Sequence, residues 1–230
     1  MNQYNFDIVN CDTDSISFCK QDFKPFPKEE IKSLLDELNK ISPDMMIWED
    51  DGHYQSVIIL RAKNYVLQKF DGTITYKGAS VKATMKEVAV KEFIKKTIDE
   101  ILNDTNRFTE VYNEYVKEIL EVKDISRWSS KKTITPSVLD PQRLTEQKIL
   151  DAIKGTEYVE GDKIRCFFMP DESLCLQEHF KGEYNKIRML EKLYNTAMIF
   201  QMVLNVDDLY LNYKLVKNQK ILGIYKEKVK

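Results

Sequence analysis

The sequence has 230 residues, 43% hydrophobic and 31% charged, which predicts a soluble globular protein with one large or two small domains. Its formal net charge of −2 argues against a uniformly basic surface but allows local basic patches. No apolar run approaches the ~20 residues of a membrane-spanning helix, and the amino-terminal sequence has no features of a secretory signal. The four cysteines form no CxxC pair, so we expect reduced thiols, no zinc site and a cytoplasmic location.

The first part of the chain has mostly β periodicity. Apolar residues at helical spacing predict one helix, over residues 28–41. Asp71-Gly72 is a strong hairpin signal between two strand-like runs. Strands are predicted at residues 6–10, 15–19, 45–49, 54–60, 64–70 and 73–77.

From about residue 84 the apolar pattern changes to helical periodicity. Helices are predicted from the capping box Thr84-Met85-Lys86-Glu87 to Leu102, over residues 108–120, from Asp140-Pro141 to Gly155, and over residues 183–204. A short strand is predicted at residues 163–168. The fold class is therefore α+β, with a partial antiparallel sheet in residues 1–83 and a mostly helical domain in residues 84–230.

Two aspartates, Asp12 and Asp14, lie one residue apart in a turn between the first two predicted strands. Two negative charges at the edge of a core cost free energy, and a divalent cation with oxygen ligands offsets that cost. The turn is therefore a candidate Mg²⁺ site for phosphoryl chemistry. Aspartate, serine and threonine are also common in ordinary turns, and a two-metal centre needs at least one further bridging carboxylate.

Two other families with acidic loops fit this turn less well. An EF-hand counted from Asp12 requires glycine and glutamate where Ser17 and Phe23 stand. A phosphatase of the haloacid dehalogenase type also places Asp-x-Asp after an apolar strand, but it usually has threonine or valine where Ile16 stands. A helix follows the loop in that family, whereas strand-like alternation follows here. Asp207-Asp208 is the one candidate for its distal acidic pair.

The tract Asp12-Thr13-Asp14-Ser15 between two strands resembles motif C, usually written YGDTDS, of family B (alpha-like) DNA polymerases. The resemblance implies that Asp14 binds both catalytic metals and that Asp12 assists. It also implies that Thr13 and Ser15 support the turn, and that the ions are Mg²⁺, with Mn²⁺ as a substitute. Asn10 stands where the family usually has tyrosine.

A second tract, residues 61–67, resembles the Lys-x-Tyr motif of the same family, which lies on a strand and contacts the primer–template duplex. Lys63 and Tyr65, two residues apart on a strand, would face the same side and contact DNA without reading its sequence. Tyr76-Lys77-Gly78 is similar to the Lys-Gly that commonly follows, which makes Lys77 a further candidate for DNA binding.

Two later tracts fit a thumb, the family's duplex-holding domain. Gly161-Asp162-Lys163-Ile164 resembles a strand start often seen there. The basic and aromatic run Arg127–Lys132 predicts a DNA-backbone contact by Lys131 and Lys132. By this resemblance, residues 1–83 are the C-terminal half of the palm, with an acidic β-hairpin, and residues 84–230 are a mostly helical thumb.

Other active-site motifs of the family have no counterpart in the chain: the Asp-x-x-Ser-Leu-Tyr-Pro strand of motif A, the fingers helix and the acidic pairs of an exonuclease. Lys192-Leu193-Tyr194-Asn195-Thr196 has a superficial likeness to the fingers helix and is interpreted as core. The resemblance therefore predicts the C-terminal subunit of a split polymerase, as suits a phage or other virus. An N-terminal partner would supply motif A, the fingers and any exonuclease.

The predicted substrates are primer–template DNA and deoxynucleoside triphosphates, in the host cytoplasm or a replication compartment if the source is viral. Residues 219–225 weakly resemble a sliding-clamp peptide, whose second aromatic is replaced by Lys226. Two alternatives stay open: a Mg²⁺-dependent phosphatase of the haloacid dehalogenase type, with Asp12 essential, and a non-catalytic DNA-binding accessory protein.

Overall fold

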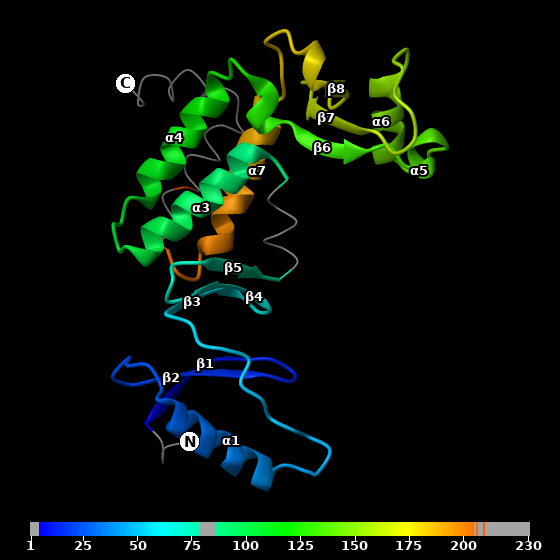
Figure 1. Ribbon diagram of the computed structural model, residues 1–230. Coiled ribbons are helices and arrows are strands. Elements are labelled where there is room, and N and C mark those ends of the chain that lie inside the picture. The colour runs from blue at the N-terminus through cyan, green and yellow to red at the C-terminus, as the bar shows by residue number, and fades with distance from the viewer. Residues whose placement is uncertain (1–4, 79–85, 205, 207–208, 210–230) are drawn as a thin grey trace. The chain divides into compact units, whose positions relative to one another are not determined.

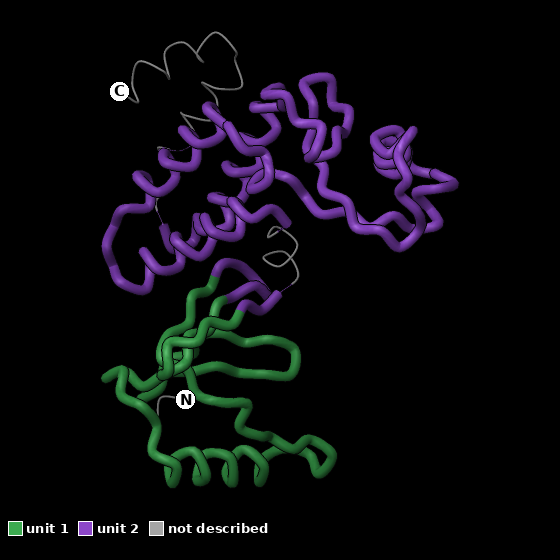
Figure 2. The backbone as a smooth tube through the Cα atoms, turned by 45° about the horizontal axis from the view of Figure 1, so that its top comes forward, with its two compact units in different colours: residues 1–59, 66–75 green, residues 60–65, 76–230 purple. Residues whose placement is uncertain are grey.

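The computed structural model describes residues 5–78, 86–204, 206 and 209. The chain divides into two compact units (Figure 2). Unit 1 comprises Met1–Ile59 and Val66–Thr75, and unit 2 comprises Leu60–Tyr65 and Tyr76–Lys230. The domain boundary predicted between residues 83 and 84 falls outside the described residues, so that boundary stays a prediction.

Unit 1 begins with an antiparallel hairpin of β1 (Phe6–Cys11) and β2 (Ile16–Lys20), followed by α1 (Lys28–Ile41), as predicted (Figure 1). Three aromatic rings tie the hairpin to the segment that enters α1: Phe6 stacks on Phe18, and the edge of Phe26 meets both. An ion pair between Lys20 and Glu30 joins β2 to the first turn of α1.

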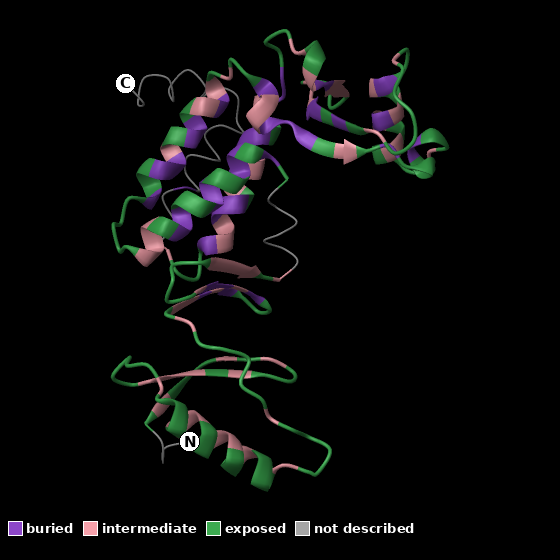
Figure 3. Cartoon of the chain, viewed as in Figure 1, coloured by how far each residue is buried: buried purple, intermediate pink, exposed green. Residues whose placement is uncertain are grey.

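Burial in this part of unit 1 is sparse. None of the described residues from 5 to 57 is buried (Figure 3). The apolar face predicted for α1 exists, but its residues are at best half-buried, and Ile41 at its end is 79% exposed. In β1, Ile8 is 51% and Val9 36% exposed. Hairpin and helix therefore cover each other only in part.

The strand predicted at residues 45–49 is wrong, because that segment is irregular. Trp48 is bound instead by the end of α1: Asn39 accepts a hydrogen bond from the Trp48 backbone N–H (2.6 Å) and donates one to its carbonyl (3.1 Å). The indole Nε1 of Trp48 donates to Ser42 Oγ (2.8 Å). These side-chain contacts take the backbone groups that a sheet would have used.

A three-stranded sheet follows, in the order β3 (Ser56–Arg61), β4 (Asn64–Gln68) and β5 (Ile74–Lys77). The hairpin predicted at Asp71-Gly72 is confirmed. Its loop closes when Lys69 N–H donates to Thr73 O (2.9 Å) and Thr73 N–H donates to Asp71 Oδ1 (2.8 Å). Gly72 has φ +82°, a conformation that glycine adopts without a steric cost.

Unit 2 is built on three helices that pack side by side, α3 (Val88–Leu102), α4 (Phe108–Leu120) and α7 (Lys186–Ala197) (Figure 1). Phe93 lies at the centre of their core and contacts Phe108, Tyr112 and Tyr115. Among the described residues, no helix has the length and apolar character to cross a membrane.

The predicted helices over residues 88–102 and 108–120 are confirmed, whereas the helix predicted at residues 183–204 needs correction. Thr84 and Met85 of the predicted capping box lie outside the described residues, and Glu87 at the start of α3 pairs with Lys192. The helix predicted at residues 183–204 is shorter. It starts at Lys186, where the Asn185 side chain caps it, and gives way to a 3-10 turn, η3 (Met198–Phe200).

A small lobe of unit 2 contains the antiparallel sheet β6 (Ser130–Thr133), β7 (Lys163–Phe168) and β8 (Leu174–Leu176). Two helices, α5 (Pro136–Leu139) and α6 (Leu144–Ile153), share its apolar core. The strand predicted at residues 163–168 is confirmed. The third predicted helix begins at Leu144 rather than Pro141, because Glu146 accepts the backbone N–H of Arg143 (3.0 Å) and caps the helix there.

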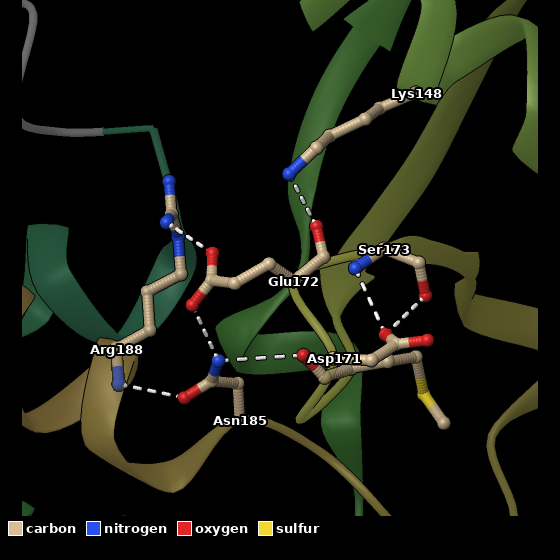
Figure 4. Close-up of polar contacts among 7 residues, drawn as sticks. Lys148, Asp171, Glu172, Ser173, Asn185 and Arg188 are labelled. Atoms are coloured by element: carbon tan, nitrogen blue, oxygen red, sulfur yellow. Dashed lines mark hydrogen bonds and ion pairs between the residues drawn. The ribbon is translucent and has the colours of Figure 1, made fainter.

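A polar network fixes the turn between β7 and β8 to two helices (Figure 4). The Glu172 carboxylate accepts from Asn185 Nδ2 (2.8 Å) and pairs with Arg188 (2.6 Å), both at the start of α7. Lys148 of α6 donates to the Glu172 carbonyl (2.6 Å). The Arg188 guanidinium lies 3.7 Å from the centre of the Phe168 ring. The described residues thus form an α+β fold of small antiparallel sheets and helices, as predicted.

Candidate active site

The tip of the β1–β2 hairpin carries Asp12 and Asp14. The Asp12 backbone N–H donates to the Ser15 carbonyl (2.9 Å), which closes the turn. Thr13 donates to Asp12 Oδ1 from both its backbone N–H (2.7 Å) and its hydroxyl (3.2 Å). The Asp12 side chain, which is half-buried, is therefore oriented by its neighbour in the turn.

Asp14 lies beside it in a different environment. Its side chain is exposed and forms no hydrogen bond or ion pair with any described residue. Carboxylate oxygens are the ligands that Mg²⁺ and Mn²⁺ prefer, so the chemistry of the pair fits a hard divalent cation. No third histidine, cysteine or acidic residue joins them in the part of the chain that the structure describes. Two carboxylates alone are fewer ligands than a two-metal centre requires.

A β-bulge lies just before the acidic turn. The pairing register shifts between Ile8 and Asn10, so that Val9 is the extra residue, and Asn10 pairs with Ser17. A bulge bends its strand and re-aims the side chains beyond it. It therefore helps to determine the direction in which the tip carrying the two carboxylates projects.

The prediction that Lys63 and Tyr65 share one strand face is wrong for Lys63. Lys63 lies in the tight turn between β3 and β4 with φ +58°, and β4 begins only at Asn64. In that left-handed conformation the side-chain alternation of a strand does not apply. Lys63 is exposed, and Tyr65 is half-buried on β4.

The structure brings two of the sequence tracts together at this turn. The backbone of Gly78, just after β5, lies so close to the Lys63 carbonyl and the Asn64 side chain that a Cβ would overlap both. Gly78 also has φ +98°. Only glycine fits there, which explains physically why a glycine follows Lys77. Lys77 is exposed at the end of β5, and burial together with Asp99 raises the pKa of Tyr76.

The run Arg127–Lys132 does not form one basic surface. Arg127, in the 3-10 helix η1 (Ile125–Trp128), pairs with Glu92 (2.6 Å) and Glu118 (3.4 Å). Trp128 is buried and donates to Glu118 (2.9 Å). Lys131 is exposed, whereas Lys132 is half-buried, and its burial and then the nearby Lys86 lower its pKa. Of the two lysines predicted to contact DNA here, Lys131 and Lys132, only Lys131 is exposed to solvent.

No function was predicted for Lys163 and Arg165 from the sequence. Both lie on β7, where Lys163 pairs with Thr133 of β6 and Arg165 pairs with Lys131 of β6. The signal for them was the alternation of charged and apolar residues in Lys163-Ile164-Arg165-Cys166. It predicts a strand with one charged face.

Of the remaining predictions, one alternative is disfavoured, one interpretation is supported, and two features lie outside the described residues. The strand β2, antiparallel to β1, follows the acidic turn where a phosphatase of the haloacid dehalogenase type has a helix, which disfavours that alternative. Lys192–Thr196 belongs to the core of α7, as interpreted: Leu193 and Thr196 are buried. Asp207-Asp208 and the clamp-like residues 219–225 lie outside the described residues.

Comparison with known proteins supports the fold. Neither the known protein families nor the curated proteins contain a match to this sequence. Among solved structures, the chain is similar to a family B DNA polymerase from the hyperthermophilic archaeon Pyrobaculum calidifontis, with a TM-score of 0.65 and 15% sequence identity. The match covers 90% of this chain and 28% of that polymerase. The chain therefore has the fold of part of a family B DNA polymerase.

Proposed function

We propose that this chain contributes the metal-binding hairpin and the duplex-holding thumb to a family B DNA polymerase. The observation that carries the proposal is the position of Asp12 and Asp14 at a hairpin tip, in a chain whose fold matches part of such a polymerase. A polypeptide segment beyond these 230 residues supplies motif A, the fingers and any exonuclease. The split, viral nature of the enzyme is part of the proposal.

In the assembled enzyme, Asp14 and Asp12 hold Mg²⁺, or Mn²⁺ in its place, together with a carboxylate from the missing segment. When bound, one of the two ions would lower the pKa of the primer 3′-hydroxyl and the other would stabilise the pyrophosphate that leaves. Thr13 keeps the Asp12 carboxylate oriented through its two hydrogen bonds. The exposed Asp14 needs no rearrangement of described partners to take up a ligand.

The turn at Lys63 and the strand β4 hold the primer–template duplex near the primer end. Lys63 supplies a positive charge from the turn to a phosphate or a minor-groove acceptor, and the Tyr65 hydroxyl donates to the duplex from β4. Support comes from Gly78, whose close approach to the Lys63 carbonyl fixes the backbone that presents the lysine. Lys77 extends the same positive region at the end of β5.

Unit 1 supports the proposal that a further segment completes the palm. Its β1–β2 sheet has two strands and exposes Ile8 and Val9. An isolated two-stranded sheet is marginally stable in water, and further strands from the segment with motif A would cover these residues. Such a segment also brings the third carboxylate that the ligand set requires.

Primer extension tests the proposal. The chain is co-expressed with the product of the neighbouring gene that carries motif A, and Asp14→Ala is compared with Asp36→Ala, an exposed aspartate of α1. We expect Asp14→Ala to reduce extension by at least about 10³-fold, because a metal ligand is lost, while Asp36→Ala behaves as wild type.

Three outcomes contradict parts of the proposal. Wild-type turnover with Asp14→Ala rules out the metal assignment. Tolerance of Asp14→Asn in the complex favours the non-catalytic accessory protein instead. Extension by the 230-residue chain alone rules out the need for a second segment.

A further inference from the structure

The strands β6 and β7 carry a charged face of which only Lys131 has been considered above as a DNA contact. Lys131 pairs with Arg165 across the strands, and Thr133 pairs with Lys163. Directly paired residues of antiparallel strands point to the same side, and so do residues two apart on one strand. Lys131, Thr133, Lys163 and Arg165 therefore project from one side of the sheet. All four are exposed.

The other side of the same two strands is an apolar core. Ile164 and Cys166 of β7 are buried there against α5 and α6. Lys132, which also projects to that side, is the half-buried lysine whose pKa burial lowers. Next along the charged side, Phe167 is buried in edge-to-face contact with Phe180 (centroids 5.5 Å apart). The exposed part of this face thus consists of cations and one hydroxyl.

Several other cations of unit 2 have carboxylate partners. Arg127, Arg188 and Lys192 each pair with a carboxylate. Lys131, Lys163 and Arg165 form no ion pair with any residue that the structure describes. In a chain with a net charge of −2, three clustered cations without carboxylate partners leave a local positive potential. They also pay no cost of breaking an ion pair when an anion binds.

The strand that carries two of the cations is firmly placed. At the carboxyl end of β7, Phe168 lies under the Arg188 guanidinium, and the next turn is bound through Glu172 to α6 and α7 (Figure 4). Cations two apart on a strand are spaced by about 6.5–7 Å, and paired ones by about 5 Å. Positive charges carried at this backbone spacing on two paired strands suit an anion with regularly repeated charges.

We propose that Lys131, Lys163 and Arg165 form a contact surface for the phosphate backbone of double-stranded DNA. The choice of DNA among repeated polyanions rests on the proposed function. The exposed face offers no apolar side chain for a protein hot spot or a lipid surface, and its long cations reach phosphates without reading base sequence. Lys132, predicted from sequence as a contact, belongs to the opposite side.

Duplex binding by the full chain tests this surface. Fluorescence anisotropy with a labelled primer–template duplex gives the affinity at several salt concentrations, for wild type and for the triple variant Lys131→Gln/Lys163→Gln/Arg165→Gln. The matched control removes three exposed lysines of α3 and α4, Lys91→Gln/Lys95→Gln/Lys117→Gln. Circular dichroism checks that each variant is folded, and Lys131→Arg/Lys163→Arg/Arg165→Lys keeps the charges.

Each phosphate contact contributes about 0.9 to the slope of log affinity against log salt concentration. In the triple variant this slope is expected to be smaller in magnitude by about 2.7. Between 50 and 200 mM salt, the factor by which its affinity falls should therefore be about 40 times smaller than the factor for wild type. The charge-keeping variant and the α3–α4 control should keep the wild-type slope.

An unchanged slope in the triple variant, an equal loss in the α3–α4 control, or no duplex binding by wild type at low salt overturns the surface assignment. None of these outcomes concerns Asp14, so the proposed function is judged separately, by primer extension. Conversely, if Asp14→Ala leaves extension intact while the slope falls as expected, the DNA surface stands and the catalytic role fails.

Discussion

The hairpin–helix part of unit 1 and the helices of unit 2 have similar amphipathic patterns but very different packing. In α1 the apolar face has no buried residue, whereas α3 buries Phe93, Ile94 and Ile98 almost completely. The difference is what lies opposite. The apolar face of α3 meets α4 and α7, while α1 is joined to the two-stranded hairpin by the ion pair of Lys20 and Glu30.

The contrast shows that an amphipathic pattern specifies a face but not what covers it. Burial of apolar area is the dominant stabilising term of a fold, so unit 2 has its own source of stability. The hairpin with Asp12 and Asp14 has little, and under the proposed function it gains the rest when the missing palm strands are added. Order at the catalytic tip then depends on assembly.

The largest expected effect comes from truncating one leucine in each unit. Leu193 of α7 is fully buried, and Leu193→Ala should lower the free energy of unfolding of unit 2 by about 3 kcal/mol. Leu35 of α1 is half-buried, and Leu35→Ala should cost unit 1 less than about 1 kcal/mol. Unit 1 has one tryptophan, Trp48, and unit 2 has one, Trp128. If one tryptophan is replaced by phenylalanine, the fluorescence of the other follows the urea unfolding of its own unit.

A loss of about 3 kcal/mol for Leu35→Ala would break the comparison, since a half-exposed leucine cannot remove that much area from water. Repeating the measurement with the co-expressed partner sharpens it. If the missing strands cover unit 1, its unfolding should shift to higher urea in the complex, while unfolding of unit 2 keeps its midpoint.

Helices with a long, strongly periodic apolar face could be predicted from the sequence: α1 and α4 are confirmed to the residue, and α3 at its carboxyl end. The errors arise where a side chain outweighs local preference. Residues 45–49 have strand composition, but Asn39 binds the Trp48 backbone and no ladder forms. The start of α6 is set by Glu146, which the Asp-Pro signal three residues earlier conceals.

At the candidate site, the acidic hairpin itself could be predicted, because strand alternation on both sides fixes its turn. The position of Lys63 could not be predicted in this way. Its left-handed turn depends on the backbone of Gly78, fifteen positions along the chain. The charged face of β6 and β7 could not be predicted in this way either, since it joins paired residues 30 and 34 positions apart in sequence.

Two glycines with similar backbones give the next test. Gly78 of unit 2 and Gly72 of unit 1 both have positive φ, +98° and +82°, but a Cβ at Gly72 meets nothing within 4 Å. The Ala substitutions share the conformational cost of about 1 kcal/mol. Gly78→Ala must also move the Lys63 turn, so we expect it to cost a further 1–2 kcal/mol or so.

Hydrogen exchange at Asn64 and Tyr65, together with urea unfolding, separates the two effects. Faster exchange in Gly78→Ala but not in Gly72→Ala shows that the close approach holds the turn. Equal behaviour of the two variants means that φ alone matters and that the Lys63 backbone is held by other contacts.

The smallest effect concerns pH and is specific to the packed core of unit 2. Burial, and next the charge of Glu92, raise the pKa of Tyr115 to about 12. Its hydroxyl is buried and forms no hydrogen bond with the described residues. An unfolded tyrosine has a pKa of about 10, so between about pH 10 and 12 the folded chain retains a proton that the unfolded chain releases.

The contribution of Tyr115 is therefore complete below about pH 10 and is lost as the pH rises through about 12. Tyr115→Phe has no ionisable hydroxyl, so its free energy of unfolding should fall less steeply over that interval. At pH 7 it should stay within about 1 kcal/mol of wild type, because no hydrogen bond is lost. Parallel alkaline curves for the two proteins would mean that water reaches the hydroxyl, and that the core around Tyr115 is less tightly closed than its packing indicates.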